Sequence, residues 1–273
     1  MQERHFNREQ YFKEQGITTK NYVIPFIYDT KKIDKNTSVL EIGCGEGGNL
    51  TPFLEAGCKK IVGIDMSTAK IEDGKKIFAN IDINNNVELI ADDIYNLSPD
   101  IIGQFDIIFA RDVLEHIHNQ ERLMGFIKGF MKPDGKFFLG FPPWHNPFGG
   151  HQQMCKSKFL SKLPYFHILP KFAYKFILKC FGETDSCISN LLEVKQTRIS
   201  IERFERILRK EGYIKNKRTF YFINPNYEVK FGIKPRKIWK LIAIIPFIRN
   251  FFITTNYYVI SLSETLPNQA SNH

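Results

Sequence analysis

The sequence predicts an α/β fold with three layers, built on a doubly wound and mostly parallel sheet. Between residues 37 and 141, short and nearly continuous apolar runs alternate with amphipathic stretches. This alternation is typical of strands joined by crossover helices. The runs are apolar throughout, as strands are when helices cover both of their faces. After residue 141 the alternation stops and resumes only near residue 200, which indicates an insert.

Seven strands and the helices between them follow from these patterns. The strands are expected over residues 38–42, 60–64, 87–90, 105–109, 136–141, 213–223 and 254–263. Helices are expected over residues 51–57, 67–80 and 118–132, and a further helix begins after Ser200 and ends at Gly212. Serine side chains cap helix N-termini, and glycine commonly ends a helix.

The net charge of +9 is unevenly distributed along the chain. Residues 151–250 carry 21 Lys and Arg against 7 Asp and Glu, or +14, whereas the remainder carries −5. Such a region is typical of a surface that meets phosphate, nucleic acid or an anionic membrane, and equally of a solvated, lysine-rich exterior.

The cysteines and the apolar stretches indicate which cellular compartment the protein occupies and whether it spans a membrane. Five cysteines without a Cys-x-x-Cys pair favour neither a disulfide framework nor a zinc site, and they fit a reducing cytoplasm. The first residues contain no apolar run of the kind that a secretory signal needs. The most apolar stretch, Leu241 to Phe252, is shorter than the roughly 20 residues of a membrane-spanning helix. We therefore expect no membrane span.

A glycine-rich turn follows the first expected strand. It reads Glu41-Ile-Gly-Cys-Gly-Glu-Gly-Gly48 and leads directly into a helix. Glycines leave room for a ligand to lie against the turn and the helix N-terminus. Gly43, Gly45 and Gly48 also match the dinucleotide pattern Gly-x-Gly-x-x-Gly, and Asp65 ends the second strand where a ribose-binding acid belongs. The turn therefore predicts a nucleoside-containing cofactor without saying which one.

Three further features separate the cofactors. Glu41 stands two residues before the first glycine, where its charge attracts a cationic methionyl group and repels a pyrophosphate. The third strand ends in Ala91-Asp-Asp-Ile94, where a carboxylate can accept from the adenine amino group while the isoleucine packs on the ring. The fourth strand continues as Phe105-Asp-Ile-Ile-Phe-Ala-Arg-Asp-Val-Leu-Glu-His-Ile117.

Together with Gly63-Ile-Asp65 and Lys132-Pro-Asp-Gly-Lys136, these blocks resemble the ordered signature of class I, or Rossmann-like, S-adenosylmethionine-dependent methyltransferases. With the helix and strands after Ser200, the resemblance covers roughly two thirds of the chain. It implies S-adenosyl-L-methionine as the cofactor and a seven-stranded sheet whose last strand is inserted antiparallel. It also implies that the cofactor lies over the carboxyl ends of the first strands.

The resemblance assigns cofactor contacts position by position. The glycine turn lines the methionyl and ribose side, and the acid after the second strand takes the ribose hydroxyls. The end of the third strand holds adenine, with Asp93 as first choice and Asp92 as second, while Met66 flanks the ring. The end of the fourth strand borders the methionyl group. In chain order the implied residues are Glu41, Gly43, Cys44, Gly45, Gly47, Asp65, Met66, Asp92, Asp93, Ile94, Ala110 and Arg111.

His116 and His145 are the candidate catalytic residues. Methyl transfer needs a base only when the acceptor must lose a proton. His116 resembles the position that acts as a base or a metal ligand in some relatives and packs structurally in others. No metal site is expected, because Glu115, His116 and His118 form too common a pattern to indicate one.

The loop after the fifth strand is expected to bind the acceptor. It is rich in proline, glycine and aromatic residues, and this fold usually opens its acceptor site there. The candidate acceptor-binding residues are Trp144, His145, Phe148 and His151.

One methyltransferase domain is expected over residues 1–273. Residues 1–30 form an N-terminal helical lid, with a helical segment from 4 to 28 that folds over the cofactor. The cofactor-binding core covers residues 37–141 and the C-terminal core residues 199–223 and 254–263. A cap insert covers residues 142–198, a second insert residues 224–253, and residues 266–273 form a frayed tail.

The expected activity is methylation of O, N or C of a small-molecule acceptor or one linked to a lipid or glycan. Two alternatives stay open: a nicotinamide-dependent oxidoreductase, which shares the glycines and Asp65, and a non-catalytic cofactor-binding module. The basic and aromatic inserts suit peripheral membrane contact. We therefore expect a cytoplasmic protein, with a peripheral position at the membrane as the sharper hypothesis. Nucleic acid is not an expected partner, because no recognised RNA-binding module accompanies the charge.

Overall fold

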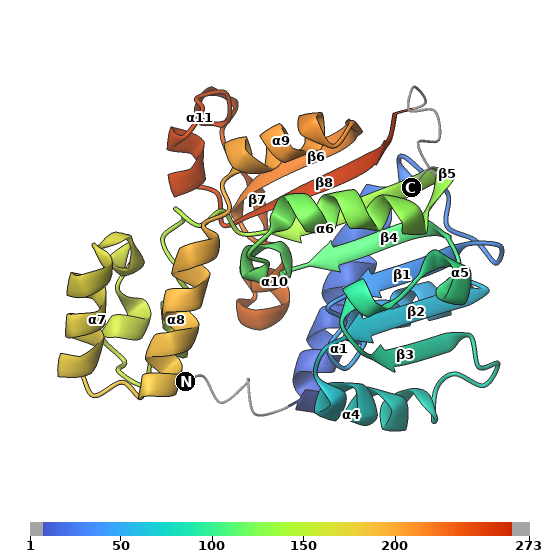
Figure 1. Cartoon of the computed structure of the whole chain (residues 1–273), viewed down its shortest axis with the longest axis horizontal. Coiled ribbons are helices and arrows are strands. Elements are labelled where there is room, and N and C mark those ends of the chain that lie inside the picture. Colours follow the sequence, from blue (N-terminus) through green and yellow to red (C-terminus); the bar gives the residue numbers. More distant parts are fainter. Residues whose placement is uncertain (1–7, 264–273) are drawn as a thin grey trace, which may run out of the picture.

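An eight-stranded sheet forms the centre of the molecule in the computed structural model, which describes residues 8–263. The strand order is β3-β2-β1-β4-β5-β8-β6-β7 (Figure 1). The strands are β1 Ser38–Ile42, β2 Lys60–Asp65, β3 Val87–Ala91, β4 Phe105–Arg111, β5 Met131–Phe141, β6 Tyr213–Ile223, β7 Arg236–Lys237 and β8 Thr255–Leu262. The expected count of seven is corrected by β7, a two-residue edge strand that is too short to leave a pattern in the sequence.

The first five strands run parallel, and β8 lies antiparallel between β5 and β6. The doubly wound, mostly parallel sheet with an inserted antiparallel strand is thus present. All five residues of β1 are buried, because helices cover both faces of the sheet. The carboxyl ends of β1, β2, β3 and β4 therefore meet along one edge.

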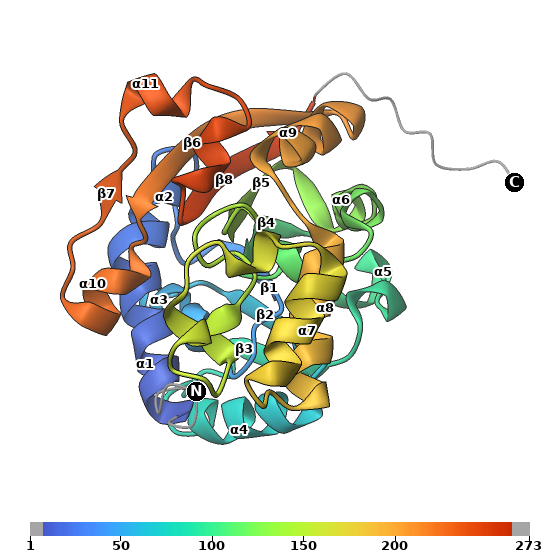
Figure 2. The ribbon, with the colours of Figure 1, turned by 90° about the vertical axis from the view of Figure 1, so that its left-hand side faces the viewer.

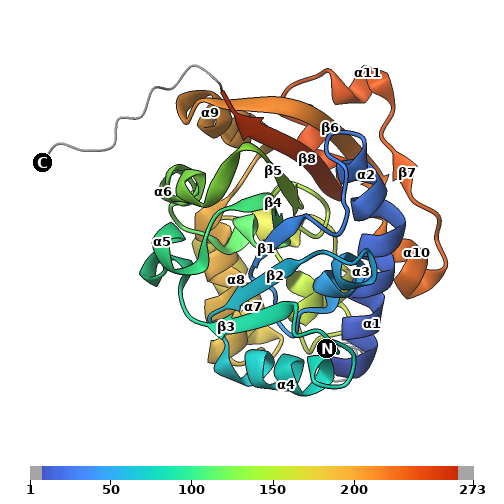
Figure 3. The same ribbon diagram turned by 90° about the vertical axis from the view of Figure 1, so that its right-hand side faces the viewer.

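Helices cover the two faces and build a core on each. One core packs α5, α6 and α9 against the sheet, and the other packs α1, α2, α3 and α4 against the opposite face (Figure 3). The helices of the two layers are α1 Arg8–Thr18, α2 Ile24–Tyr28, α3 Thr51–Glu55, α4 Thr68–Phe78, α5 Pro99–Ile102, α6 Gln120–Ile127 and α9 Ile201–Lys210. At the start of α9, the Ser200 side chain accepts from the Arg203 backbone N–H, as the capping pattern predicts.

The N-terminal helix lies across the glycine-rich turn. A π-helical turn, Thr19–Val23, connects α1 to α2. A Cβ added to Gly48 would lie 2.4 Å from the Phe12 carbonyl oxygen, so only glycine permits α1 to approach this closely. Residues 1–7 of the expected lid and the expected tail at 266–273 lie outside the described residues.

The cap insert lies beyond the carboxyl ends of the strands and has a small core of its own (Figure 2). Its helices are α7 Lys171–Cys180 and α8 Asp185–Thr197, and the second insert holds α10 Asn226–Phe231 and α11 Lys240–Ala243. Within residues 8–263, the structure contains no helix with the length and apolar character needed to cross a bilayer.

Candidate functional site

Hydrogen bonds to the neighbouring strand β2 fix the position of the turn after β1. The backbone N–H groups of Gly43 and Cys44 both donate to the Ile64 carbonyl of β2. Gly45 has a φ of +58°, a left-handed conformation that glycine adopts without strain. The nearest atom to a Cβ built on Gly45 is Lys70 Cδ at 3.8 Å, so this side of the turn is open to a ligand.

Asp65 joins the turn to the end of β2. Its Oδ2 accepts from the Gly45 N–H at 2.9 Å, and its Oδ1 accepts from the Ser67 N–H at 2.9 Å. Each carboxylate oxygen has two lone pairs, so acceptor capacity remains for the two hydroxyls of a ribose. The backbone therefore orients this carboxylate toward the mouth of the turn.

The end of β3 supplies two further carboxylates. Asp92 Oδ1 accepts from the Asp93 backbone N–H and from the Asn96 side chain, each at 2.7 Å. Asp93 Oδ1 accepts from the Tyr95 N–H at 3.1 Å and caps a short helical turn. Ile94 follows and is buried, as expected of a residue that packs on a ring.

Glu41 is completely buried beneath the turn. Its Oε1 accepts from Asn49 Nδ2 at 2.6 Å, whereas its Oε2 has no hydrogen-bond partner among residues 8–263. Burial raises the pKa of this carboxyl to about 8, although the Asn49 hydrogen bond and the Arg111 charge oppose the shift. Arg111 donates to Thr19 Oγ1 at 3.2 Å, and Thr19 donates to Asn49, so a buried polar chain links the π-helical turn after α1 to β1 and β4.

These residues surround one cavity of about 500 Å³ at the carboxyl edge of the sheet. Of the residues implied by the resemblance, those that line it are Gly43, Gly45, Asp65, Met66, Asp92, Asp93, Ile94 and Arg111. Glu41, Cys44, Gly47 and Ala110 lie outside that lining and are buried.

The cavity also has lining residues that the sequence analysis did not select. Tyr11 and Gln15 come from α1, Asp112 and Val113 follow β4, and Glu193 comes from α8. Asp112 has a φ of +57° and stands directly after Arg111. Its place in the fourth-strand block was the only available signal, whereas nothing in the sequence indicates which residues of α1 and α8 reach the cavity.

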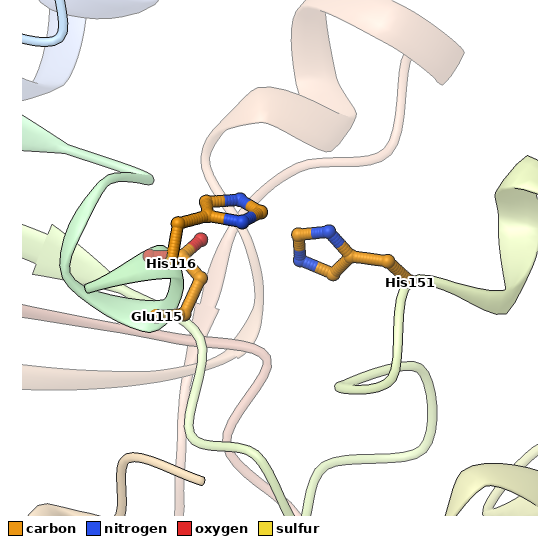
Figure 4. Close-up of side chains that lie close together, drawn as sticks. All are labelled: Glu115, His116 and His151. Carbon is orange, nitrogen blue, oxygen red and sulfur yellow. The ribbon is translucent and has the colours of Figure 1, made fainter. Parts of the chain in front are cut away.

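The cap brings a second histidine to the rim of this cavity. His116 lines it, and its ring centroid lies 4.9 Å from that of His151, edge to face (Figure 4). Glu115 is buried beside them, and neither of its carboxylate oxygens has a hydrogen-bond partner among residues 8–263. Partial loss of water around the ring at the cavity rim lowers the pKa of His116 below its usual value, and burial lowers that of His151 to about 4. Both imidazoles are therefore neutral near pH 7 and able to accept a proton.

The ligand atoms of Glu115, His116 and His151 lie within 4.8 Å of one another. A carboxylate and two neutral imidazoles at this spacing are suited to passing a proton and to binding a divalent cation. His118, the third residue of the Glu115, His116 and His118 pattern, lies apart from this group: its Nε2 is 3.4 Å from Glu193 Oε1.

The other residues of the loop after β5 pack away from the cavity lining. Trp144 is buried, with its ring near Lys195 Nζ and the His167 ring. The His145 ring packs edge to face against Trp144 and at a tilt against Phe251, and Phe148 donates its backbone N–H to Asn146 Oδ1. His151, by contrast, packs its ring on His116, which lines the cavity.

Comparison with known families decides between the cofactors. Residues 33–212, about two thirds of the chain, match the family model described as a methyltransferase domain. The chain belongs to this methyltransferase family. The expected membership of the class I, S-adenosylmethionine-dependent methyltransferases is thus confirmed, and the nicotinamide-dependent oxidoreductase no longer stands as an alternative.

Curated relatives match the cofactor-binding part of this methyltransferase chain. A sterol 4-C-methyltransferase of Caenorhabditis elegans is 30% identical over 113 residues, covering 41% of this chain and 33% of the relative. A ubiquinone biosynthesis O-methyltransferase of Coxiella burnetii is 34% identical over 105 residues, covering 38% of this chain and 43% of the relative. In both comparisons the chain spans less than half of the relative's length.

A solved structure shares the fold over most of the methyltransferase chain. The magnesium protoporphyrin IX methyltransferase of Synechocystis PCC 6803, solved with S-adenosylhomocysteine, is 14% identical with a TM-score of 0.55. The alignment covers 91% of this chain and 84% of that one. At this identity the likeness establishes the fold alone.

The residues of this methyltransferase site fit S-adenosylmethionine. Gly45 leaves open space beside the Asp65 carboxylate, where a ribose would lie. The buried Glu41 carboxyl, whose Oε2 has no hydrogen-bond partner among residues 8–263, would ionise more readily beside the cationic methionyl end. The cavity volume also falls in the range of about 300–1,000 Å³ typical of small-molecule sites.

Proposed function

We propose that the protein transfers the methyl group of S-adenosylmethionine to a small-molecule or lipid-linked acceptor. The observation that carries this proposal is the convergence of three strand ends on one cavity. Asp65 at the end of β2, Asp93 after β3 and Arg111 at the end of β4 all line it beside the glycine turn. When bound, the cofactor supplies a methyl group that its sulfonium activates toward displacement, and the protein contributes mainly by positioning the two reactants.

The central test is replacement of Asp65. Asp65→Ala removes the carboxylate that accepts from Gly45 and faces the ribose position, so calorimetry should show binding of S-adenosylmethionine weakened about tenfold or more, since a charged hydrogen bond contributes about 1.5–3 kcal/mol. Asp100→Ala, an exposed carboxylate on α5, is the matched control. Normal cofactor binding by Asp65→Ala would contradict the site assignment. Tight binding without turnover on any acceptor would favour the non-catalytic module instead.

We assign His116 the role of the base that removes the acceptor proton. It lines the cavity, its imidazole is neutral near pH 7 because partial loss of water around the ring lowers its pKa, and the His151 ring lies against it. A neutral imidazole within reach of an acceptor hydroxyl accepts its proton as the methyl group is transferred. His145 is left out of this assignment, because its ring packs on Trp144 and Phe251 instead.

The two inserts favour a lipid-linked acceptor presented at an anionic membrane surface. On α7, Phe172 and Phe176 are 79% and 67% exposed, while Tyr174 on the opposite face is buried. In the second insert, Trp239 and Leu241 are each 78% exposed. Both α7 and α11 lie on the left-hand side of Figure 1, at the carboxyl end of the sheet.

Lysines border both exposed apolar faces. Lys171, Lys175 and Lys179 are exposed along α7, and Lys237 and Lys240 flank Trp239. Exposed aromatic side chains bordered by lysine are typical of surfaces that lie in the interface of an anionic bilayer. We name the exposed apolar side chains of α7 and of residues 239–248, with these lysines, the aromatic–basic face.

A further inference from the structure

A second group of candidate ligands lies inside the cap, away from the cofactor cavity. Cys155 follows the short helical turn at Gln152–Met154, Glu183 precedes α8, and Cys187 lies in the first turn of α8. Their Sγ atoms and a carboxylate oxygen all lie within 4.8 Å of one another. The sequence gives no sign of this group, because 28 residues separate Cys155 from Glu183.

Apolar side chains of the cap border this group on one side, and Cys187 Sγ donates to the Met154 carbonyl at 3.9 Å. Cys155 is part of the cap core, which is completed by Leu160, Phe166, Tyr174, Leu178, Ile188 and Leu191. Glu183 is only 7% exposed and forms no salt bridge with a Lys or Arg of residues 8–263. Its two oxygens accept from the backbone N–H groups of Lys156 and Ser157, at 3.0 and 2.9 Å. A carboxylate is thus held by backbone groups in a small core beside two thiols.

Access and geometry suit an ion at this place. None of the five cysteines forms a disulfide, and Cys187 is partly exposed, so solvent reaches one side of the group. Two sulfur ligands and one carboxylate oxygen match the ligand preferences of zinc, which binds thiolate sulfur at about 2.3 Å and often keeps water in a fourth position. Hard cations such as Mg²⁺ and Ca²⁺ prefer oxygen ligands only.

We propose that Cys155, Glu183 and Cys187 bind one zinc ion, with a water molecule as the fourth ligand. Each thiol gives up its proton to solvent when the ion binds, so binding strengthens as the pH rises. The ion joins the loop that precedes the cap core to the first turn of α8. That loop carries His151 four residues before Cys155, so the ion stabilises the segment that places His151 against His116.

The test measures metal content of the full chain, purified with a reductant that does not bind zinc. After zinc loading and dialysis, elemental analysis should find one zinc per chain in His151→Ala, a background that disables the other candidate ligand set. In that background Cys187→Ser should lower the zinc affinity at least tenfold. Cys180→Ser, which changes an exposed cysteine of the same insert, should leave it unchanged.

Cobalt substitution identifies the ligands directly. Co²⁺ bound by these residues should give a thiolate-to-cobalt absorption band that Cys187→Ser weakens and Cys180→Ser retains. Because Cys187 is partly exposed, the variant should keep the circular dichroism spectrum of the parent. Absence of the thiolate band, equal zinc loss in both cysteine variants, or a Cys155–Cys187 disulfide in the reduced preparation would each overturn the proposal.

Discussion

The chemistry of individual residues at this site depends on burial as much as on identity. Glu41 and Glu115 are carboxyl groups in nearly dry surroundings, whereas Asp65 and Asp93 are partly exposed and held by backbone N–H groups. Burial raises the pKa of Glu41 and Glu115, since removal from water disfavours the charged form. The partly exposed pair can thus serve as hydrogen-bond acceptors for a nucleoside. A charged ligand that binds nearby would change the protonation of the buried pair.

Replacement of His116 should remove the acceptor base. For an acceptor that loses a proton, His116→Ala should lower kcat by about 10²–10⁴-fold with little effect on cofactor binding. The pKa of His116 is below 6.5, so wild-type kcat should fall only as the pH drops below that value and stay level near neutrality. Initial rates from pH 5 to about 8 measure both effects.

The control for His116 is His118→Ala, since His118 is exposed and pairs with Glu193. A kcat for His116→Ala within a few-fold of the wild type would contradict the base assignment. So would complete loss of activity when a chelator is added to Cys187→Ser, which lacks the zinc site proposed for the cap, because the two histidines would then hold a cation and not a proton.

Glu41 should make folding stability fall as the pH rises. Its folded pKa of about 8 lies above the ordinary value of 4.5, so between these values the folded chain holds a proton that the unfolded chain has released. Its contribution is therefore present at low pH and is lost toward pH 8, by up to about 1.4 kcal/mol per pH unit.

Glu41→Gln should remove this dependence. The measurement is the free energy of unfolding in urea, without cofactor, at pH 5 and pH 8. The value for the variant relative to that of the wild type should be higher at pH 8 than at pH 5. Glu88→Gln, at an exposed position of β3, should show a constant difference. A constant difference for Glu41→Gln as well would argue against the raised pKa.

At the scale of the elements, the strand ends could be predicted from the sequence, whereas the packing of helices against the cavity could not. Apolar runs mark β1, β2, β3 and β4, and the residues after each run necessarily meet at one edge of a parallel sheet. This is why candidate cofactor residues could be selected from the sequence, and why most of them line one cavity. The approach of α1 depends on side-chain packing, which leaves no period in the sequence that would identify Tyr11 or Gln15.

The contacts made by the cap could not be predicted from the sequence either. His151 is 35 residues from His116, and Cys155 is 32 from Cys187. Neither spacing belongs to a local motif, and both contacts depend on how the cap folds back over the sheet. The aromatic loop that suggested acceptor binding by Trp144 packs against the lower part of the cap. There Lys195 lies over the indole ring of Trp144 and donates to the backbone carbonyls of His167 and Leu169.

Gly48→Ala should displace α1 and weaken cofactor binding. The new Cβ would meet the Phe12 carbonyl 2.4 Å away, so α1 must move, and Tyr11 and Gln15 move with it from the cavity. We expect the KM for S-adenosylmethionine to rise at least tenfold. Gly57→Ala, at a positive-φ glycine with open space around it, should cost about 1 kcal/mol of stability yet leave that KM unchanged. An unchanged KM in Gly48→Ala would contradict the lid role of α1.

At the scale of the whole molecule, charge and exposed apolar surface coincide. The +14 charge of residues 151–250 covers α7 and α11, the helices of the aromatic–basic face. Trp239, on the aromatic–basic face, is 78% exposed, whereas Trp144, the other tryptophan, is 5% exposed. A change in the fluorescence of exposed tryptophan therefore reports on the aromatic–basic face alone.

Vesicles containing phosphatidylglycerol should bind the protein, and those of pure phosphatidylcholine should not. Binding should shift Trp239 emission to shorter wavelength and weaken as the salt concentration rises above about 0.15 M, where the Debye length falls below about 8 Å. Phe172→Ser with Phe176→Ser should reduce sedimentation with vesicles. Ile83→Ser, at an exposed isoleucine of similar apolar character between α4 and β3, should not. Equal sedimentation with both lipids would contradict an anionic membrane as the partner.

The antiparallel β8 has a consequence for synthesis of the chain. It lies between β5 and β6, so these two strands cannot complete the sheet until Thr255–Leu262 has left the ribosome. During translation, β1 to β5 can already associate and expose the edge of β5, which is a ready template for pairing with another chain. Binding of S-adenosylmethionine to the nascent glycine turn would then stabilise only five of the eight strands. A chaperone that shields the β5 edge would raise the yield of native enzyme.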